Sequence, residues 1–177
     1  CVGRGEGWKR QGLLGNKLMK HKTGRCACGQ ITYAFSGEPI NTVFCYCKQC
    51  QIHTGSDKWF GIWVHKENFT FMKGRPSVYT RVGDSGQPTN YQFCHHCGTT
   101  VCAEITVGNF YSIAASTLDN TDGLAPDMLI YRAYAPSWAT IPENIPSYDI
   151  LPPFLTYPLH KSQAAHKPPS GTRGAHR

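Results

Sequence analysis

Short runs in which apolar and polar residues alternate recur along the middle of the chain. In 30–36, Ile31, Tyr33 and Phe35 alternate with polar or small residues, which is the period of a strand with one buried face. The run 59–64 is rich in aromatic and β-branched residues, which favour strands. The same reasoning predicts strands at 40–44, 69–73, 77–82, 90–93, 99–105, 111–115 and 127–132.

Turn signals separate these runs. Gly83-Asp84-Ser85-Gly86 predicts a tight hairpin, and the polar segment 119–123 predicts another turn. Residues 45–54 are expected to form a compact loop or helical turn that Gly55 closes. Because the strands follow one another at a spacing of about ten residues and no long stretch has a helical period, the sequence predicts a mainly β domain.

The chain of 177 residues is expected to form one domain with two tails. We place the domain at 24–150, a basic N-terminal tail at 1–23, and a Pro-rich, basic C-terminal tail at 151–177 that is expected to be disordered. The net charge of +7 lies in the two ends, because 1–23 carries +5, 157–177 carries +4 and the middle carries −2. A nucleic-acid-binding domain needs positive charge on its folded surface, so no nucleic-acid partner is expected.

Composition excludes a fully disordered chain and a membrane-spanning protein. Hydrophobic residues make up 40% of the chain, which is enough for a core and excludes wholesale disorder. No apolar run approaches the roughly 20 residues of a membrane-spanning helix, so no membrane association is expected.

Nine cysteines are the strongest chemical signal, and their spacing argues against a disulfide framework. The count is odd, and the cysteines of Cys26-Ala27-Cys28 and Cys45-Tyr46-Cys47 stand only two residues apart, which rarely allows disulfide geometry. Close thiols suit a soft tetrahedral cation such as zinc. Because such ligands are thiolates, the expected location is a reducing intracellular compartment, the cytoplasm.

The first predicted site is structural. Cys94-His95-His96-Cys97-Gly98, a CxxC followed by glycine between two strands, is typical of a zinc-ribbon knuckle, and Cys26-Ala27-Cys28-Gly29 offers a second pair of ligands. A closed structural site takes four ligands. We therefore predict one zinc ion held by Cys26, Cys28, Cys94 and Cys97.

The second predicted site is catalytic. Cys45, Cys47 and Cys50 pack three thiols into six residues, and three protein ligands with one exchangeable position are the arrangement of a catalytic zinc. Near them, Lys48 could attract an anionic substrate and Ser56 could line a pocket.

The same cysteine triple has a less specific interpretation. It could hold a second structural zinc, with Cys102 or a histidine as the fourth ligand, and His53 is the nearest histidine in sequence. Cys102 stands in an apolar strand, where a cysteine is more often a small buried hydrophobe. His95 and His96 are expected to be exposed loop residues.

Four motifs resemble one known family. They are 24–33, which contains Cys26 and Cys28; 45–50 followed by Gly55-Ser56; 93–99; and 116–119. They are similar to the glutathione-dependent formaldehyde-activating enzymes and the related centromere protein V. The resemblance implies an Mss4-like fold, a twisted antiparallel β architecture around zinc. It also implies the same division of cysteines into a structural and a catalytic site.

The activity implied by the resemblance is condensation of formaldehyde with glutathione to S-hydroxymethylglutathione, formally a carbon–sulfur lyase reaction in reverse. The leading hypothesis is therefore a zinc-dependent carbon–sulfur lyase-type enzyme with a glutathione-like thiol and a small aldehyde as substrates. The alternative is a non-enzymatic zinc-binding scaffold whose basic tails bind an acidic partner.

Overall fold

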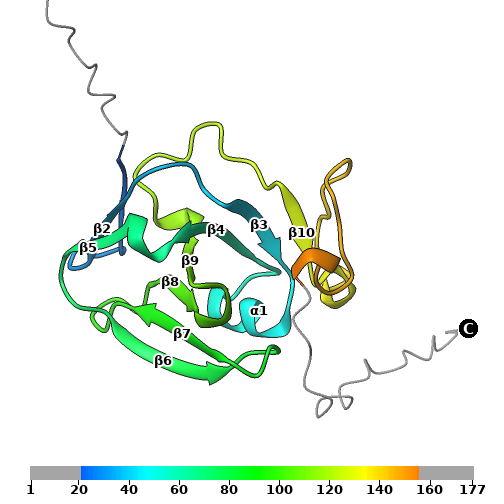
Figure 1. Cartoon of the computed structure of the whole chain (residues 1–177), viewed down its shortest axis with the longest axis horizontal. Helices are drawn as coiled ribbons and strands as arrows, with labels where there is room; N and C mark the ends of the chain where they lie inside the picture. The colour runs from blue at the N-terminus through cyan, green and yellow to red at the C-terminus, as the bar shows by residue number, and fades with distance from the viewer. Residues whose placement is uncertain (1–20, 156–177) are drawn as a thin grey trace, which may run out of the picture.

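The computed structural model describes residues 21–155, which form ten strands in two sheets and one α-helix (Figure 1). Residues 1–20 and 156–177, which hold most of the two predicted tails, lie outside the described part of the chain. The strands are β1 (Lys22–Arg25), β2 (Thr32–Phe35), β3 (Asn41–Cys45), β4 (Trp59–His65), β5 (Phe69–Lys73), β6 (Ser77–Val82), β7 (Pro88–Phe93), β8 (Thr100–Ile105), β9 (Phe110–Ala114) and β10 (Met128–Ile130).

The larger sheet has seven strands in the order β10-β3-β4-β9-β8-β7-β6. Its neighbours pair antiparallel except β10 and β3, which are parallel. Figure 1 shows the sheet curving from β10 round to β6, with the helix α1 (Lys48–Thr54) lying inside the curve. This curvature brings the two ends of the sheet towards α1.

The smaller sheet has the order β1-β2-β5 and is antiparallel. The mainly β prediction is confirmed, and every predicted strand has a counterpart within a few residues of its expected bounds. β1 was not predicted, because Lys22–Arg25 has one buried residue and three exposed ones and so no alternating pattern. β10 is shorter than predicted, since the chain leaves the sheet after Ile130.

One apolar core lies between the two sheets. Tyr33 and Phe35 of β2 and Phe69 of β5 pack there against Ile62 and Ile113 of the larger sheet. The alternation seen in 30–36 therefore places one face of β2 in this core, as the sequence predicts.

A second core covers the opposite face of the larger sheet. Its buried members include Val43, Cys45, Trp59, Trp63, Phe110, Met128 and Ile130. The segment after β10 folds back over this core: Tyr148 donates to the Leu129 carbonyl, and Leu151 and Leu155 pack against the cluster. The central strands β4 and β9 of the larger sheet, which lie between this segment and the first core, are therefore mostly buried on both faces, whereas the edge strand β6 stays largely exposed.

Short 3-10 turns connect several strands: Lys66–Asn68, Thr106–Gly108, Ala115–Thr117, Arg132–Tyr134 and Pro153–Leu155. The described residues contain no helix long and apolar enough to cross a membrane.

Candidate metal centres

The first centre, called here the four-cysteine cluster, consists of Cys26, Cys28, Cys94 and Cys97. Their Sγ atoms all lie within 4.8 Å of one another, although 66 residues separate Cys28 from Cys94. The first pair lies between β1 and β2 and the second between β7 and β8. The four ligands of the predicted structural site are thus brought together from both sheets.

Two similar backbone turns position these thiols. In the first, the Gly29 amide donates to the Cys26 carbonyl at 3.0 Å, and in the second the Gly98 amide donates to the Cys94 carbonyl at 2.8 Å. Both glycines have a positive φ, 71° and 72°, which residues with a Cβ adopt at a cost. The Ala27 amide also donates to the Thr99 hydroxyl and links the two knuckles.

The sulfur spacing fits a tetrahedral zinc. The Sγ atoms of Cys26 and Cys28 are 3.6 Å apart, and those of Cys28 and Cys94 are 3.7 Å apart. Zn–S bonds of about 2.3 Å in a tetrahedron place two sulfurs about 3.8 Å apart, whereas a disulfide needs about 2.05 Å. The cluster is therefore arranged for a metal and not for cystine.

The second centre is the cysteine triple, Cys45, Cys47 and Cys50, whose Sγ atoms also lie within 4.8 Å of one another. Cys45 ends β3, Cys47 is the N-cap of α1, and Cys50 lies in the first turn of that helix. The Cys50 amide donates to the Cys47 Sγ at 3.4 Å. The start of α1 therefore curls the chain so that three thiols converge.

Within the triple, the environment of Cys47 lowers the pKa of its thiol and favours the thiolate form. Hydrogen bonds from the thiols of Cys45 and Cys50, assisted by the Cys50 amide and the charge of Arg81, lower the pKa of Cys47 to about 3 despite its burial. A thiolate is the form that binds zinc. In the four-cysteine cluster the Thr99 hydroxyl similarly lowers the pKa of Cys97 to about 5.

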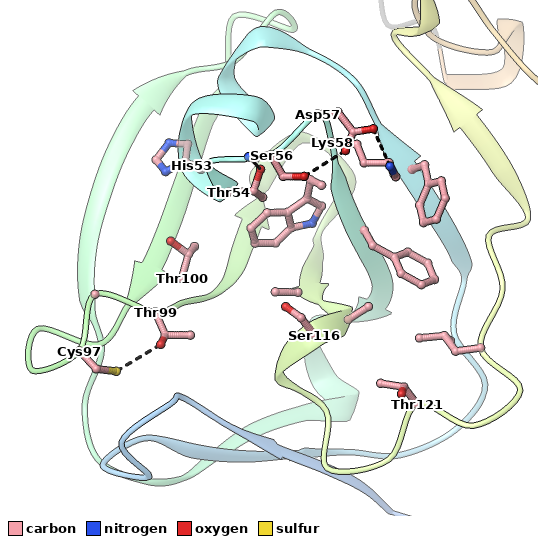
Figure 2. Close-up of a pocket in the computed structure, with 17 residues that line it drawn as sticks. His53, Thr54, Ser56, Asp57, Lys58, Cys97, Thr99, Thr100, Ser116 and Thr121 are labelled. Atoms are coloured by element: carbon pink, nitrogen blue, oxygen red, sulfur yellow. Dashed lines mark hydrogen bonds and ion pairs between the residues drawn. The ribbon is translucent and has the colours of Figure 1, made fainter. Parts of the chain in front are cut away.

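The two polar residues predicted beside the triple lie apart from each other. Lys48 is the exposed first residue of α1. Ser56 follows the helix, and its hydroxyl donates to Asp57 Oδ1 at 3.0 Å, while Lys58 Nζ lies 2.6 Å from Asp57 Oδ2. Figure 2 shows Ser56 at the rim of a cleft of about 790 Å³ that faces Cys97, Thr99 and Ser116. No cysteine of the triple lines this cleft.

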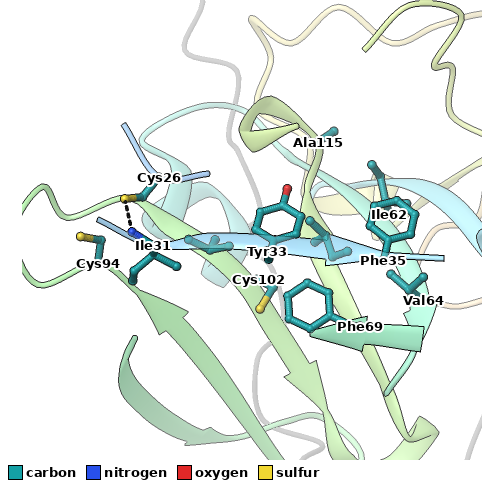
Figure 3. Packing of buried hydrophobic residues seen from close by; sticks show 12 residues of the cluster. Cys26, Ile31, Tyr33, Phe35, Ile62, Val64, Phe69, Cys94, Cys102 and Ala115 are labelled. Atoms are coloured by element: carbon teal, nitrogen blue, oxygen red, sulfur yellow. Dashed lines mark hydrogen bonds between the residues drawn. The ribbon is translucent and has the colours of Figure 1, made fainter. Parts of the chain in front are cut away.

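The candidate fourth ligands lie elsewhere. Cys102 is fully buried in the core between the sheets, with Tyr33 and Phe69 in the same cluster (Figure 3), and burial raises the pKa of its thiol. The His53 ring stacks on Tyr91 with 3.6 Å between ring centroids. In the described part of the chain, no fourth cysteine, histidine or acidic residue joins the triple.

Several residues around the triple were not predicted. Tyr91 of β7 covers His53, the Arg81 Nε of β6 donates to the Tyr91 hydroxyl at 3.4 Å, and the Tyr131 hydroxyl donates to Asp84 Oδ2 at 2.7 Å. The last bond joins the turn after β6 to the residue after β10, so both ends of the larger sheet meet near α1. No spacing in the sequence signals these residues, because they lie more than 30 residues away from the triple.

Fold and sites together define a class: small, mainly β proteins with two cysteine clusters that could each hold a metal ion, one of four cysteines and one of three. A sequence model of the family "glutathione-dependent formaldehyde-activating enzyme" matches residues 21–134, which include all seven cysteines of the two centres. The chain belongs to this family, and the resemblance and the fold class inferred from the sequence are confirmed.

Solved structures similar to this chain include the crystal structure of a Rhodobacter sphaeroides protein, with 16% sequence identity and a TM-score of 0.47 over 57% of this chain and 91% of that one.

Proposed function

We propose that the protein is a zinc-dependent enzyme of the carbon–sulfur lyase type that adds a glutathione-like thiol to a small aldehyde such as formaldehyde at the cysteine triple. The observation that carries this proposal is the convergence of three Sγ atoms within 4.8 Å with no fourth protein ligand in the described chain. Family membership supports the same reaction class. The four-cysteine cluster, which has no open position, is proposed as the structural zinc site.

The residues of the triple fit the catalytic role. Hydrogen bonds from the Cys45 and Cys50 thiols lower the pKa of Cys47 and favour its thiolate, and all three Sγ atoms lie close enough to share one ion. A zinc ion bound there would supply Lewis acidity and one exchangeable coordination position. Because thiolate ligands persist under reducing conditions, we propose that the protein works in the cytoplasm.

The proposed reaction forms one bond between the thiol sulfur and the aldehyde carbon. The carbonyl π pair moves to oxygen, which takes up a proton to balance the one lost by the thiol. The addition is bimolecular in solution, so holding both reactants side by side supplies much of the rate. Tyr131 packs in the same apolar cluster as the triple, and Tyr91 stacks on His53 of α1, so both rings would restrict water near the site.

Replacing Cys50 by Ala tests the proposal. We expect the variant to keep its circular dichroism spectrum, to lose one zinc ion per chain by metal analysis, and to stop accelerating S-hydroxymethylglutathione formation measured by exchange NMR. Cys102→Ala is the matched control, because it also removes one cysteine thiol, but from the apolar core and not from either metal centre. This variant should keep both zinc ions and the wild-type rate of S-hydroxymethylglutathione formation.

Two results would contradict the catalytic assignment. Loss of the folded spectrum in Cys50→Ala would indicate that the triple is a second structural site. An unchanged rate in a variant that has lost one zinc would place the reaction elsewhere.

A further inference from the structure

Arg81 is a partly buried cation on which the negative charges of Asp84 and Cys47 act without a contact ion pair. On β6, its Nε donates to the Tyr91 hydroxyl and its Nη1 donates to the Val82 carbonyl at 2.9 Å. The ion pairs formed in residues 21–155 all involve other cations. Asp84, three residues on, instead accepts the hydroxyl proton of Tyr131. The guanidinium is therefore held in place but not neutralised by contact.

The position of Arg81 relates it to the triple. The Arg81 Cζ lies 5.9 Å from the centroid of the Tyr91 ring, and the same ring stacks on His53, which is one helical turn beyond Cys50. The positive charge of Arg81 also contributes to the lowered pKa of Cys47, which agrees with this geometry. Through Tyr91 and His53, the guanidinium is thus linked to α1, the helix that carries Cys50 of the triple.

A guanidinium that has lost part of its hydration and forms no contact ion pair can still bind an anion. Its planar fork matches a carboxylate and can donate two parallel hydrogen bonds to it. Lys48 offers the same charge, but it is exposed and no contact fixes its ammonium group. Arg81 is preorganised by Tyr91 and Val82, so less side-chain entropy is lost when it binds.

We propose that Arg81 binds a carboxylate of the thiol substrate and makes the site selective for thiols that carry a carboxylate over neutral thiols. This rests on the proposed function, since it takes the cysteine triple as the place of the sulfur. Arg81 is then a specificity-determining residue supplied by the far edge of the sheet.

Calorimetric binding to the zinc-loaded protein tests the proposal with three ligands. Glutathione carries thiol and carboxylates, S-methylglutathione keeps the carboxylates but blocks the thiol, and glutathione diethyl ester keeps the thiol but blocks both carboxylates. The variants are Arg81→Gln and Arg81→Lys. Arg75→Gln is the matched control, because it removes the same charge from an exposed position in the turn before β6.

We expect Arg81→Gln to weaken binding of glutathione and S-methylglutathione by the same factor, roughly tenfold or more as for a charge-assisted hydrogen bond. The diester should bind wild type and variant equally, Arg75→Gln should change none of the three, and Arg81→Lys should fall between wild type and Arg81→Gln. Metal analysis and circular dichroism must show both zinc ions and the fold retained.

The outcomes separate this proposal from the one on which it rests. Equal weakening of all three ligands, or weakening of none, would overturn the role of Arg81. If S-methylglutathione shows the Arg81 effect but blocking the thiol costs wild type no affinity, the carboxylate contact stands and the thiol site at the triple does not. If the wild type binds none of the three ligands, both proposals are wrong.

Discussion

Single residues around the centres are constrained by close contacts. Tyr131 adopts φ 56°, a left-handed conformation that is unfavourable for a large side chain and costs of order 1 kcal/mol. Its amide donates to the Ile150 carbonyl at 2.7 Å and its hydroxyl donates to Asp84. These two bonds hold the ring beside the triple, which gives a physical reason for the unusual backbone.

Gly24, the first residue of the Gly24–Tyr33 motif, is constrained by lack of space. A Cβ there would overlap the Tyr33 hydroxyl and would lie 2.5 Å from the Thr117 carbonyl oxygen. Tyr33 is buried and its hydroxyl is hydrogen-bonded to Thr117, so neither group can move freely. We expect Gly24→Ala to lower the free energy of unfolding by about 1–3 kcal/mol, measured by urea denaturation of the zinc-loaded protein.

Gly83→Ala is the control for this prediction. Its Cβ would meet nothing closer than the Thr89 Oγ1 at 3.0 Å, so the same substitution should cost clearly less. Equal unfolding midpoints for the two variants would show that the contact at Gly24 relaxes without cost.

Among the secondary-structure elements, α1 is the one that brings the three cysteines of the triple together. The helix has seven residues, no acidic residue in its first turn and no buried residue, so it is too short to be stable by itself. Its N-cap is Cys47 of the triple, and its C-cap is Gly55, which has φ 64° and donates to the Gln51 carbonyl. Metal binding and helix formation should therefore stabilise each other.

Gly55→Ala should weaken this helix and with it the triple. Nothing lies within 4 Å of the added Cβ, so the cost is the left-handed backbone alone, about 1 kcal/mol. We expect zinc affinity at the triple, measured by chelator competition, to fall severalfold. Gly55→Asn is the matched variant, because asparagine tolerates this conformation; it should retain most of the affinity. Equal losses in the two variants would count against a role of the cap.

For the whole molecule, the four-cysteine cluster is a link between the two sheets. Cys26 and Cys28 lie beside the three-stranded sheet, whereas Cys94 and Cys97 join strands of the seven-stranded one. The core between the sheets begins directly beneath this cluster, since Cys26, Cys94 and Ile31 belong to it (Figure 3). A metal bound there would add to the free energy of folding.

Cys94→Ser should therefore destabilise the entire domain. We expect it to cost about 4 kcal/mol or more, as losses of structural metal do, and to lower the thermal midpoint. Cys50→Ala is the comparison, with an expected cost under about 2 kcal/mol, because the triple holds a seven-residue helix and not two sheets. A Cys94→Ser midpoint equal to that of Cys50→Ala would contradict this division of roles.

The sequence predicted best the strands that have one buried face or that end at a glycine. β2 alternates because one face meets the core, and β5 and β6 end at Gly74 and Gly83, so their bounds coincide with the predicted ones. β1 pairs with β2 through its backbone while most of its side chains stay exposed, and such a strand leaves no periodic signal. The parallel pairing of β10 with β3 joins segments about 85 residues apart and also leaves no local trace.

By itself, the sequence identified the two groups of cysteines that could hold metal ions. Ligands that share one ion within a turn or knuckle are neighbours in the chain, so Cys26 with Cys28, Cys94 with Cys97, and the triple can be recognised from spacing alone. Only the tertiary structure decided what surrounds the triple. Arg81, Tyr91 and Tyr131 reach it because the seven-stranded sheet curves and brings its two edge regions to α1. Contacts of this kind depend on strand order and curvature, which are set by the packing of the whole core and not by any local pattern.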